Sequence, residues 1–253
     1  MKLAIPALLG AMCCAAQNGP VRIILVGDST VAPVNGWGPG FCALTSPEVT
    51  CVNLGKNGRS TSSYRAEGSW DKVIEQLKSG GSFRATYVLI QFGHNDQPGK
   101  AGRSTDLATE FPANMRRYAQ EVAAAGGKPV LVTPLTRRSF QNGKLKADLV
   151  EWATATKKVA AEEGVPVRDL NTDSMAAVQA MGPMDANTLA MVPPPPEVIA
   201  GAKNGNSPAS PKEGPSTQFD YTHLGEKGWA FFGKMVASEL VEAVPELGPF
   251  FKP

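Results

Sequence analysis

Residues 21–30 constrain the fold of this chain more than any other stretch. Four consecutive aliphatic residues at 23–26 are followed abruptly by the sequence Gly-Asp-Ser-Thr. A strand that is apolar on both faces is typical of the interior of a parallel sheet. Ligands of such open sheets bind beyond the carboxyl ends of the strands, so Ser29 becomes a candidate for chemistry. The alternative is that Asp28, Ser29 and Thr30 only cap a turn or a helix.

The rest of the chain continues this alternation of strands and helices. Strand, helix and strand follow one another five times, which predicts a parallel sheet with helices on both faces. We expect Ser69 to cap the helix that begins there. Further strands are predicted at 48–53, 87–92, 129–133 and 165–167, and helices at 41–46, from 69 to the glycines at 80 and 81, from 111 to the glycines at 126 and 127, and at 147–163.

Length and composition point to one domain and argue against several partners. The chain has 253 residues, of which 42% are hydrophobic, enough for one sizeable core. The formal net charge is only +2 and the basic residues are scattered, so nucleic acid is not an expected partner. The chain has only two histidines and no Cys/His cluster, so we expect no metal. We expect a monomer.

The first residues match a secretory signal peptide. Residues 1–16 carry the basic residue Lys2 near their start, continue with an apolar segment and end in small residues up to Ala16. The apolar segment is too short to span a bilayer, although a buried helix remains an alternative. We therefore expect a secreted, extracellular protein that consists of residues 17–253 and has no membrane partner.

Cysteine content and a proline-rich segment add two further predictions. Of the four cysteines, Cys42 and Cys51 lie beyond the predicted signal peptide. In an oxidising compartment they either form a disulfide or remain buried thiols. Residues 193–217 are rich in Pro, Gly, Ser and Asn, so we predict one long surface loop there. A linker is the alternative, but the residues that follow are too few for a second domain. An amphipathic helix with Trp229 and Leu240 follows this loop.

Ser29, Asp220 and His223 supply the three groups of a nucleophilic triad. A serine hydroxyl becomes a good nucleophile when an imidazole takes its proton and a carboxylate orients that imidazole. An Asp three residues before a His reaches the second ring nitrogen across a tight turn. Alone, this spacing also fits a capped helix with a surface His. The Gly-x-Ser-x-Gly motif of ordinary α/β-hydrolases is absent.

Candidate oxyanion donors follow three successive predicted strands. The N–H groups of Ser29 and Gly58 and the side-chain amide of Asn95 are of the type that stabilises charge on a carbonyl oxygen. Each has a simpler interpretation, because Gly58 fits a turn with positive φ and Asn95 is a common turn former. Because all three follow the carboxyl ends of strands, we expect them to meet at one edge of the sheet.

Four segments resemble the sequence blocks of the SGNH (GDSL-like) hydrolases. They are Gly-Asp-Ser-Thr at 27–30, the glycine-rich loop with Gly58, Gly-His-Asn-Asp at 93–96, and the pair formed by Asp220 and His223. Matches at 57–60, 63–64, 67–70 and 92–96 are similar to rhamnogalacturonan acetylesterases. The resemblance covers about residues 21–240.

The resemblance implies a fold and residue roles. The fold is an α/β/α three-layer sandwich on a five-stranded parallel sheet. Ser29 would be the nucleophile, His223 the base and Asp220 the residue that orients it. Ser29, Gly58 and Asn95 would form the oxyanion hole.

The resemblance also implies a function: a secreted serine esterase that removes acetyl groups from plant cell-wall polysaccharide, above all rhamnogalacturonan, without a cofactor. His94 is expected to shape the site or contact substrate. Lys56, Arg59, Arg65 and Arg103 are candidates for contact with an acidic polysaccharide, and ordinary solvated charge is the alternative.

Three rival functions remain open at this stage. The first is acetylxylan or another carbohydrate esterase of the same fold. The second is a secreted carbohydrate-binding protein that has lost catalysis. The third is a metallophosphoesterase built on Asp28, Asp96 and Asp220, for which the chain has few histidines.

Overall fold

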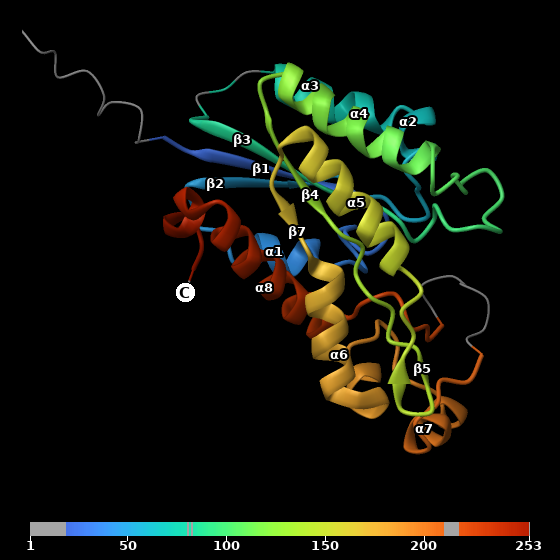
Figure 1. Ribbon diagram of the computed structural model, residues 1–253. Coiled ribbons are helices and arrows are strands. Elements are labelled where there is room, and N and C mark those ends of the chain that lie inside the picture. Colours follow the sequence, from blue (N-terminus) through green and yellow to red (C-terminus); the bar gives the residue numbers. More distant parts are fainter. Residues whose placement is uncertain (1–18, 80, 82, 210–217, 253) are drawn as a thin grey trace, which may run out of the picture.

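A parallel sheet forms the centre of the computed structural model (Figure 1), which describes residues 19–79, 81, 83–209 and 218–252. The five strands pair in the order β2-β1-β3-β4-β7, and every pairing is parallel. The α/β fold with a five-stranded parallel sheet is therefore confirmed. The predicted signal peptide at 1–16 lies outside the described residues. The strands are β1 Val21–Gly27, β2 Val49–Asn53, β3 Ala85–Gln91, β4 Lys128–Val132 and β7 Val167–Arg168.

Helices cover both faces of the sheet, as Figure 1 shows. On β1, Ile23 and Leu25 pack against α1, α6 and α8, whereas Ile24 and Val26 pack against α3, α4 and α5. Successive strand residues point to opposite faces, so a strand between two helical layers must be apolar throughout. The helices are α1 Gly38–Ala43, α2 Ser63–Ala66, α3 Ser69–Lys78, α4 Glu110–Ala124, α5 Val150–Glu163, α6 Leu170–Asn187, α7 Pro196–Lys203 and α8 Glu226–Ala243, followed by the 3₁₀ helix η1 Pro245–Phe250.

The proline-rich segment is not one irregular loop. Residues 196–203 form α7, so the prediction of an unbroken loop over 193–217 is wrong for this part; residues 210–217 lie outside the described residues. A proline at the first helical position loses no hydrogen bond, because the N–H groups there have no partner within the helix. Val198 of α7 packs with Phe219 and Tyr221, which anchors this helix beside the segment that carries Asp220.

Two further local predictions need correction. Ser69 does not cap α3, because Gly68 occupies the cap position at φ 79° and Ser69 is the first helical residue. The helix α6 was not predicted. Its apolar residues form no clear face, and it is kinked at Gly182, which precedes Pro183.

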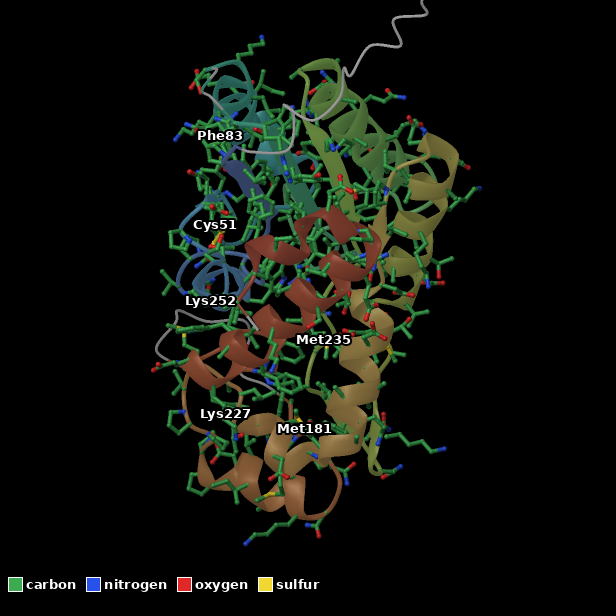
Figure 2. All side chains as sticks on the ribbon, turned by 90° about the vertical axis from the view of Figure 1, so that its left-hand side faces the viewer. Cys51, Phe83, Met181, Lys227, Met235 and Lys252 are labelled. Atoms are coloured by element: carbon green, nitrogen blue, oxygen red, sulfur yellow. A yellow bond between two sulfur atoms is a disulfide. The ribbon has the colours of Figure 1, made fainter. Side chains whose placement is uncertain are left out.

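A disulfide joins Cys42 of α1 to Cys51 of β2, and Figure 2 shows it beside the label of Cys51.

A short hairpin, β5 Phe140–Gln141 and β6 Lys144–Leu145, turns at Asn142, whose φ of 51° suits a tight hairpin turn. Within the described parts of the chain, no helix is both long and apolar enough to cross a bilayer.

Candidate active site

The carboxyl ends of β1, β2 and β3 bring the predicted site residues to one edge of the sheet. The loop before Gly58 is tied to β1, because the Lys56 N–H donates to the Gly27 carbonyl at 2.9 Å. The segment after His223 is tied to the loop after β1, because the Leu224 N–H donates to the Asn35 carbonyl at 2.9 Å. The structure thus assembles at one place segments that are far apart in the sequence.

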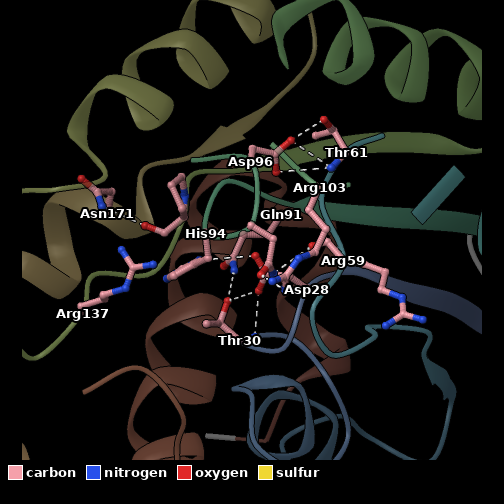
Figure 3. Close-up of polar contacts among 12 residues, drawn as sticks. Asp28, Thr30, Arg59, Thr61, Gln91, His94, Asp96, Arg103, Arg137 and Asn171 are labelled. Carbon is pink, nitrogen blue, oxygen red and sulfur yellow. Dashed lines mark hydrogen bonds and ion pairs between the residues drawn. The ribbon is translucent and has the colours of Figure 1, made fainter. Parts of the chain in front are cut away.

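A buried hydrogen-bond network shapes the turn that presents Ser29 (Figure 3). Asp28 Oδ1 accepts from the N–H and the hydroxyl of Thr30, at 2.8 and 2.7 Å. The Thr30 hydroxyl accepts in turn from Gln91 Nε2 at 2.5 Å, and Gln91 Oε1 accepts from Trp37 Nε1 at 2.9 Å. These bonds link the turn to β3 and to the start of α1. The network therefore holds the backbone on both sides of Ser29.

His94 lies against this network. Its Nδ1 is 3.4 Å from Asp28 Oδ2, and the two side chains are almost completely buried. Burial alone would raise the pKa of Asp28, but the neighbouring His94 imidazole and the hydrogen bonds from Thr30 lower it. With His94 only 3% exposed, this position fits a residue that shapes the turn better than one that contacts substrate.

Asp220 and His223 form a close pair. His223 Nδ1 lies 2.7 Å from Asp220 Oδ2, while Asp220 Oδ1 accepts from the N–H groups of Thr222 and His223, each at 2.7 Å. Burial would raise the pKa of Asp220, but the hydrogen bonds and charge of His223 outweigh it and lower the pKa to about 2. The carboxylate stays ionised and holds Nδ1, so Nε2 is the ring nitrogen that remains to accept a proton. No hydrogen bond joins Ser29 to His223 among the described residues; such bonds are often long in free enzymes.

Arg138, which no sequence pattern predicted, holds the Asp220–His223 segment. This fully buried guanidinium donates from Nη1 to the Thr222 carbonyl at 3.2 Å, and from Nη2 to the carbonyls of Asp220 and His223 at 3.1 and 2.9 Å. The Arg138 N–H also donates to the Tyr221 carbonyl at 2.9 Å. Burial lowers the pKa of Arg138 to about 10, against the charge of Asp220. All its partners are carbonyl oxygens, which any residue provides, so no sequence motif reveals this contact.

Asn95 and Gly58 lie side by side. Asn95 Nδ2 donates to the Arg59 carbonyl at 3.1 Å, and Arg103 Nη1 donates to Asn95 Oδ1 at 3.1 Å and to the Gly58 carbonyl at 3.4 Å. Gly58 has a φ of 73°, a left-handed conformation that favours glycine. The Asn95 amide therefore lies directly beside the glycine-rich loop, as an oxyanion hole requires.

The buried side chain of Asp96 connects the loop after β3 to the loop after β2. It accepts hydrogen bonds from the N–H and hydroxyl of Thr61, at 3.0 and 2.5 Å, and from the hydroxyl of Thr105 at 2.9 Å. Burial raises the pKa of Asp96 to about 6, although these hydrogen bonds act to lower it. The contacts with Thr61 and Thr105 were not predicted, because Thr61 lies 35 residues from Asp96 in the sequence.

Three of the four basic residues proposed for substrate contact are paired with carboxylates. Glu67 accepts from Arg59 Nη2 at 2.6 Å and lies 3.0 Å from Lys56 Nζ, and the bonds from Arg59 lower the pKa of Glu67 despite its partial burial. Arg65 pairs with Glu121 at 2.9 Å. Arg103 has no carboxylate partner in the part of the chain that the structure describes. A hollow of about 430 Å³ opens beside these side chains and is lined by Gly58, Arg59, Ser62, Ser63, Ala66, Glu67, Gly102 and Arg103.

The described residues also bear on the metal-dependent alternative. Asp28, Asp96 and Asp220 are each engaged by protein donors, as described above. Among residues 19–79, 81, 83–209 and 218–252, no group of three or more His, Cys, Asp or Glu side chains is arranged to hold a metal ion.

This three-layer fold, with a serine, a glycine and an amide side chain in the loops after three neighbouring strands, is that of an SGNH hydrolase. The chain belongs to the GDSL-like Lipase/Acylhydrolase family, whose family model matches residues 25–190. The protein is accordingly a carboxylic ester hydrolase.

Individual relatives agree with this assignment. The chain is 35% identical over 237 residues to the rhamnogalacturonan acetylesterase RhgT of Bacillus subtilis, covering 90% of this chain and 91% of the relative. Among solved structures, the protein YXIM of Bacillus subtilis shares the fold with a TM-score of 0.66 at 22% identity; the match covers 88% of this chain but only 56% of that longer one. The acetylxylan esterase Axe2 of Geobacillus stearothermophilus shares it with a TM-score of 0.57 at 16% identity, covering 92% and 96%.

Proposed function

We propose that this protein is a secreted carbohydrate esterase that removes acetyl groups from rhamnogalacturonan, a pectic polysaccharide of the plant cell wall. The observation that carries the catalytic part is the Asp220–His223 pair, hydrogen-bonded at 2.7 Å on a segment tied to the loop after Ser29. The substrate is supported by the similarity to RhgT along nearly the whole chain.

The reaction proceeds through an acetyl-serine. His223 Nε2 takes the proton of the Ser29 hydroxyl as the serine oxygen bonds to the acetyl carbonyl carbon. The N–H groups of Ser29 and Gly58 and the Asn95 amide stabilise the negative charge that develops on the carbonyl oxygen. The bond between the carbonyl carbon and the sugar oxygen then breaks, and His223 donates its proton to that oxygen, which leaves as a sugar hydroxyl. A water that His223 deprotonates hydrolyses the acetyl-serine, so acetate leaves and Ser29 is regenerated.

The charge around the site supports an acidic polymer as substrate. Arg103 lines the hollow beside Gly58 and has no carboxylate partner among the described residues. A uronic acid next to the acetylated sugar would supply that carboxylate, whereas a neutral xylan would not. Lys56, Arg59 and Arg65 contribute less to this argument than the sequence suggested, because protein carboxylates already neutralise them.

Kinetics on a small acetyl ester tests the catalytic assignment. Ser29→Ala is expected to abolish measurable turnover of 4-nitrophenyl acetate, and Asn95→Ala to lower it by about 10²- to 10³-fold. Ser79→Ala, at an exposed serine after α3, is the matched control and is expected to keep full activity. Full activity of Ser29→Ala would contradict the mechanism.

Acetate release from a panel of acetylated polymers tests the substrate. We expect release from acetylated rhamnogalacturonan to exceed release from acetylated xylan. The reverse preference would favour the acetylxylan esterase alternative. Binding to the polymer with neither acetate release nor labelling by a serine-reactive phosphonate would favour the non-catalytic carbohydrate-binding alternative.

Secretion is a separate part of the proposal. It is supported by the signal-like sequence of residues 1–16 and by the disulfide between Cys42 and Cys51, a bond typical of oxidising compartments. Expression in the native host, followed by N-terminal sequencing of the extracellular protein, is expected to give Gln17 as the first residue.

A further inference from the structure

Arg103 contacts both loops that carry the proposed oxyanion donors. Its Nη1 donates to Asn95 Oδ1 at 3.1 Å and to the Gly58 carbonyl at 3.4 Å. The residue itself lies in a turn beyond the Asn95 loop, where its N–H donates to the Lys100 carbonyl at 2.9 Å. Figure 3 shows its side chain reaching into the polar cluster beside Arg59. One guanidinium therefore bridges the loop after β2 and the loop after β3.

The hydrogen bond from Arg103 to Asn95 determines the orientation of the Asn95 side-chain amide. Asn95 Oδ1 accepts from Arg103, and Asn95 Nδ2 donates to the Arg59 carbonyl at 3.1 Å. A flipped amide would place its NH₂ group against a guanidinium and its oxygen against a carbonyl, so both contacts would be lost. Within the described residues, the second amide hydrogen of Asn95 bonds to no protein acceptor. It is the hydrogen available to an ester oxygen.

The same guanidinium closely borders Gly58. A Cβ atom at position 58 would lie 3.4 Å from Arg103 Nη1, and the φ of 73° already disfavours any side chain there. Because Arg103 holds the Gly58 carbonyl while Asn95 holds the Arg59 carbonyl, two successive peptide groups are fixed relative to the amide. The loop that directly follows the Gly58 N–H thus keeps one geometry relative to the Asn95 amide before substrate arrives.

No carboxylate of the described residues draws the Arg103 guanidinium away from these two loops. Glu67 engages the neighbouring Arg59 and Lys56, whereas no carboxylate of the described residues engages Arg103. Among the described residues, the guanidinium therefore donates only to Asn95 Oδ1 and to the Gly58 carbonyl.

We propose that Arg103 is a positioning residue of the oxyanion hole, which orients the Asn95 amide and holds the Gly58 loop against it. This inference rests on the proposed function, because it takes Gly58 and Asn95 as the groups that stabilise the oxyanion. Arg103 acts through these two residues and not by direct contact with the reacting atoms.

A double-mutant cycle on 4-nitrophenyl acetate tests this role. This substrate is uncharged and contains no sugar, so its turnover does not depend on any contact between Arg103 and an acidic polymer. The variants are Arg103→Met, Arg103→Lys, Asn95→Ala and the double variant Arg103→Met with Asn95→Ala. Arg117→Met is the matched control, because Arg117 is exposed on α4 and pairs only with Glu121 in the described structure. Thermal unfolding of each variant checks that the fold is intact.

Arg103→Met is expected to lower kcat by about 10- to 100-fold with KM changed less than about twofold, because the amide is misoriented while substrate binding is kept. Arg103→Lys keeps one charged donor and is expected to recover part of that loss. In the Asn95→Ala background, Arg103→Met is expected to cost clearly less than it does in the wild type, because the part of its effect that runs through Asn95 is already lost and only the contact with the Gly58 loop remains.

Three results would overturn the inference: full activity of Arg103→Met, an effect on KM alone, or losses that multiply in the double variant. If Asn95→Ala keeps full activity while Ser29→Ala is inactive, the oxyanion assignment and this inference both fail, although the serine mechanism stands. If Ser29→Ala is active, the proposed function itself fails. The failures are thus distinguishable.

Discussion

The two sides of the candidate site differ in the most deeply buried charged group that anchors their backbone. On the nucleophile side, meaning the loops with Ser29, Gly58 and Asn95, buried carboxylates accept hydrogen bonds from N–H and hydroxyl groups. On the base side, meaning residues 220–223, the buried guanidinium of Arg138 donates to backbone carbonyls. The buried carboxylates of Asp28 and Asp96 thus anchor the first side, beside the partly buried donor Arg103, whereas the fully buried donor Arg138 anchors the second.

The two sides are therefore expected to respond differently to a change in pH. The pKa of Asp96 on the nucleophile side is raised to about 6 by burial, so its charge changes within the range where an esterase works. The pKa of Arg138 on the base side is lowered only to about 10, so its charge does not change there. The base side is therefore expected to keep its geometry across neutral pH, while the nucleophile side responds to pH.

Of the substitutions that test this difference between the two sides, removal of Arg138 is expected to have the largest effect. Arg138→Met leaves the carbonyls of Asp220, Thr222 and His223 without their buried donor, so the Asp–His pair loses its position. We expect kcat on 4-nitrophenyl acetate to fall by about 10²- to 10³-fold and the free energy of unfolding to fall by about 3 kcal/mol.

Steady-state kinetics with chemical denaturation measures both effects. Arg138→Lys is the paired variant, since it keeps the charge but cannot reach three carbonyls at once, and an intermediate loss is expected. If Arg138→Met retained wild-type kcat, the base side would not depend on this residue.

Asp28→Asn perturbs the nucleophile side by a smaller amount. The Asn oxygen can still accept from Thr30, so the turn is kept, but the negative charge 3.4 Å from His94 is lost. We expect kcat to fall about 10-fold, because the buried pair beneath Ser29 is weakened while the nucleophile remains. Thr30→Val, which removes the hydroxyl bonds to Asp28 and Gln91 but not the charge, is the control for the charge effect. A larger loss in Thr30→Val than in Asp28→Asn would show that the turn matters more than the charge.

The smallest expected effect is a pH-dependent change in stability. Because the pKa of Asp96 is raised from 3.8 to about 6, the folded protein binds this proton more tightly than the unfolded chain does. The stability from this group is fully present below pH 3.8 and is lost as the pH rises through about 6. Asp96→Asn mimics the protonated form and avoids that loss. We expect its stability relative to wild type to rise by about 1–3 kcal/mol between pH 4 and pH 7.

Denaturation curves at several pH values measure this change. Asp106→Asn is the control with the opposite sign: hydrogen bonds from Thr109 lower the pKa of the exposed Asp106, so its stabilising effect is lost as the pH falls. Parallel pH profiles of wild type and Asp96→Asn would rule out an effect of Asp96 ionisation on stability.

Sequence patterns predicted much of the fold because those patterns are local. The apolar run at 23–26 predicted a strand buried on both faces. The structure confirms this, because alternate residues of the run belong to the hydrophobic cores on opposite faces of the sheet. Glycine and proline signals gave less reliable results: the composition of 193–217 favoured a loop, yet prolines at the start of α7 are compatible with a helix. The helix α6 was missed because its residues form no apolar stripe, and only its packing against the rest of the protein stabilises it.

The sequence by itself determined the residue types of the site and their order along the chain: a serine after the first strand, an amide after the third, and an Asp–x–x–His pair near the end. Only the tertiary structure decided what holds them. Arg138 and Thr222 are 84 positions apart, and Thr61 and Asp96 are 35 apart. Such contacts join a side chain to a backbone group or to a common hydroxyl, so they leave no periodic or motif signal. They form because a buried polar group must find a partner, and the fold brings that partner within reach.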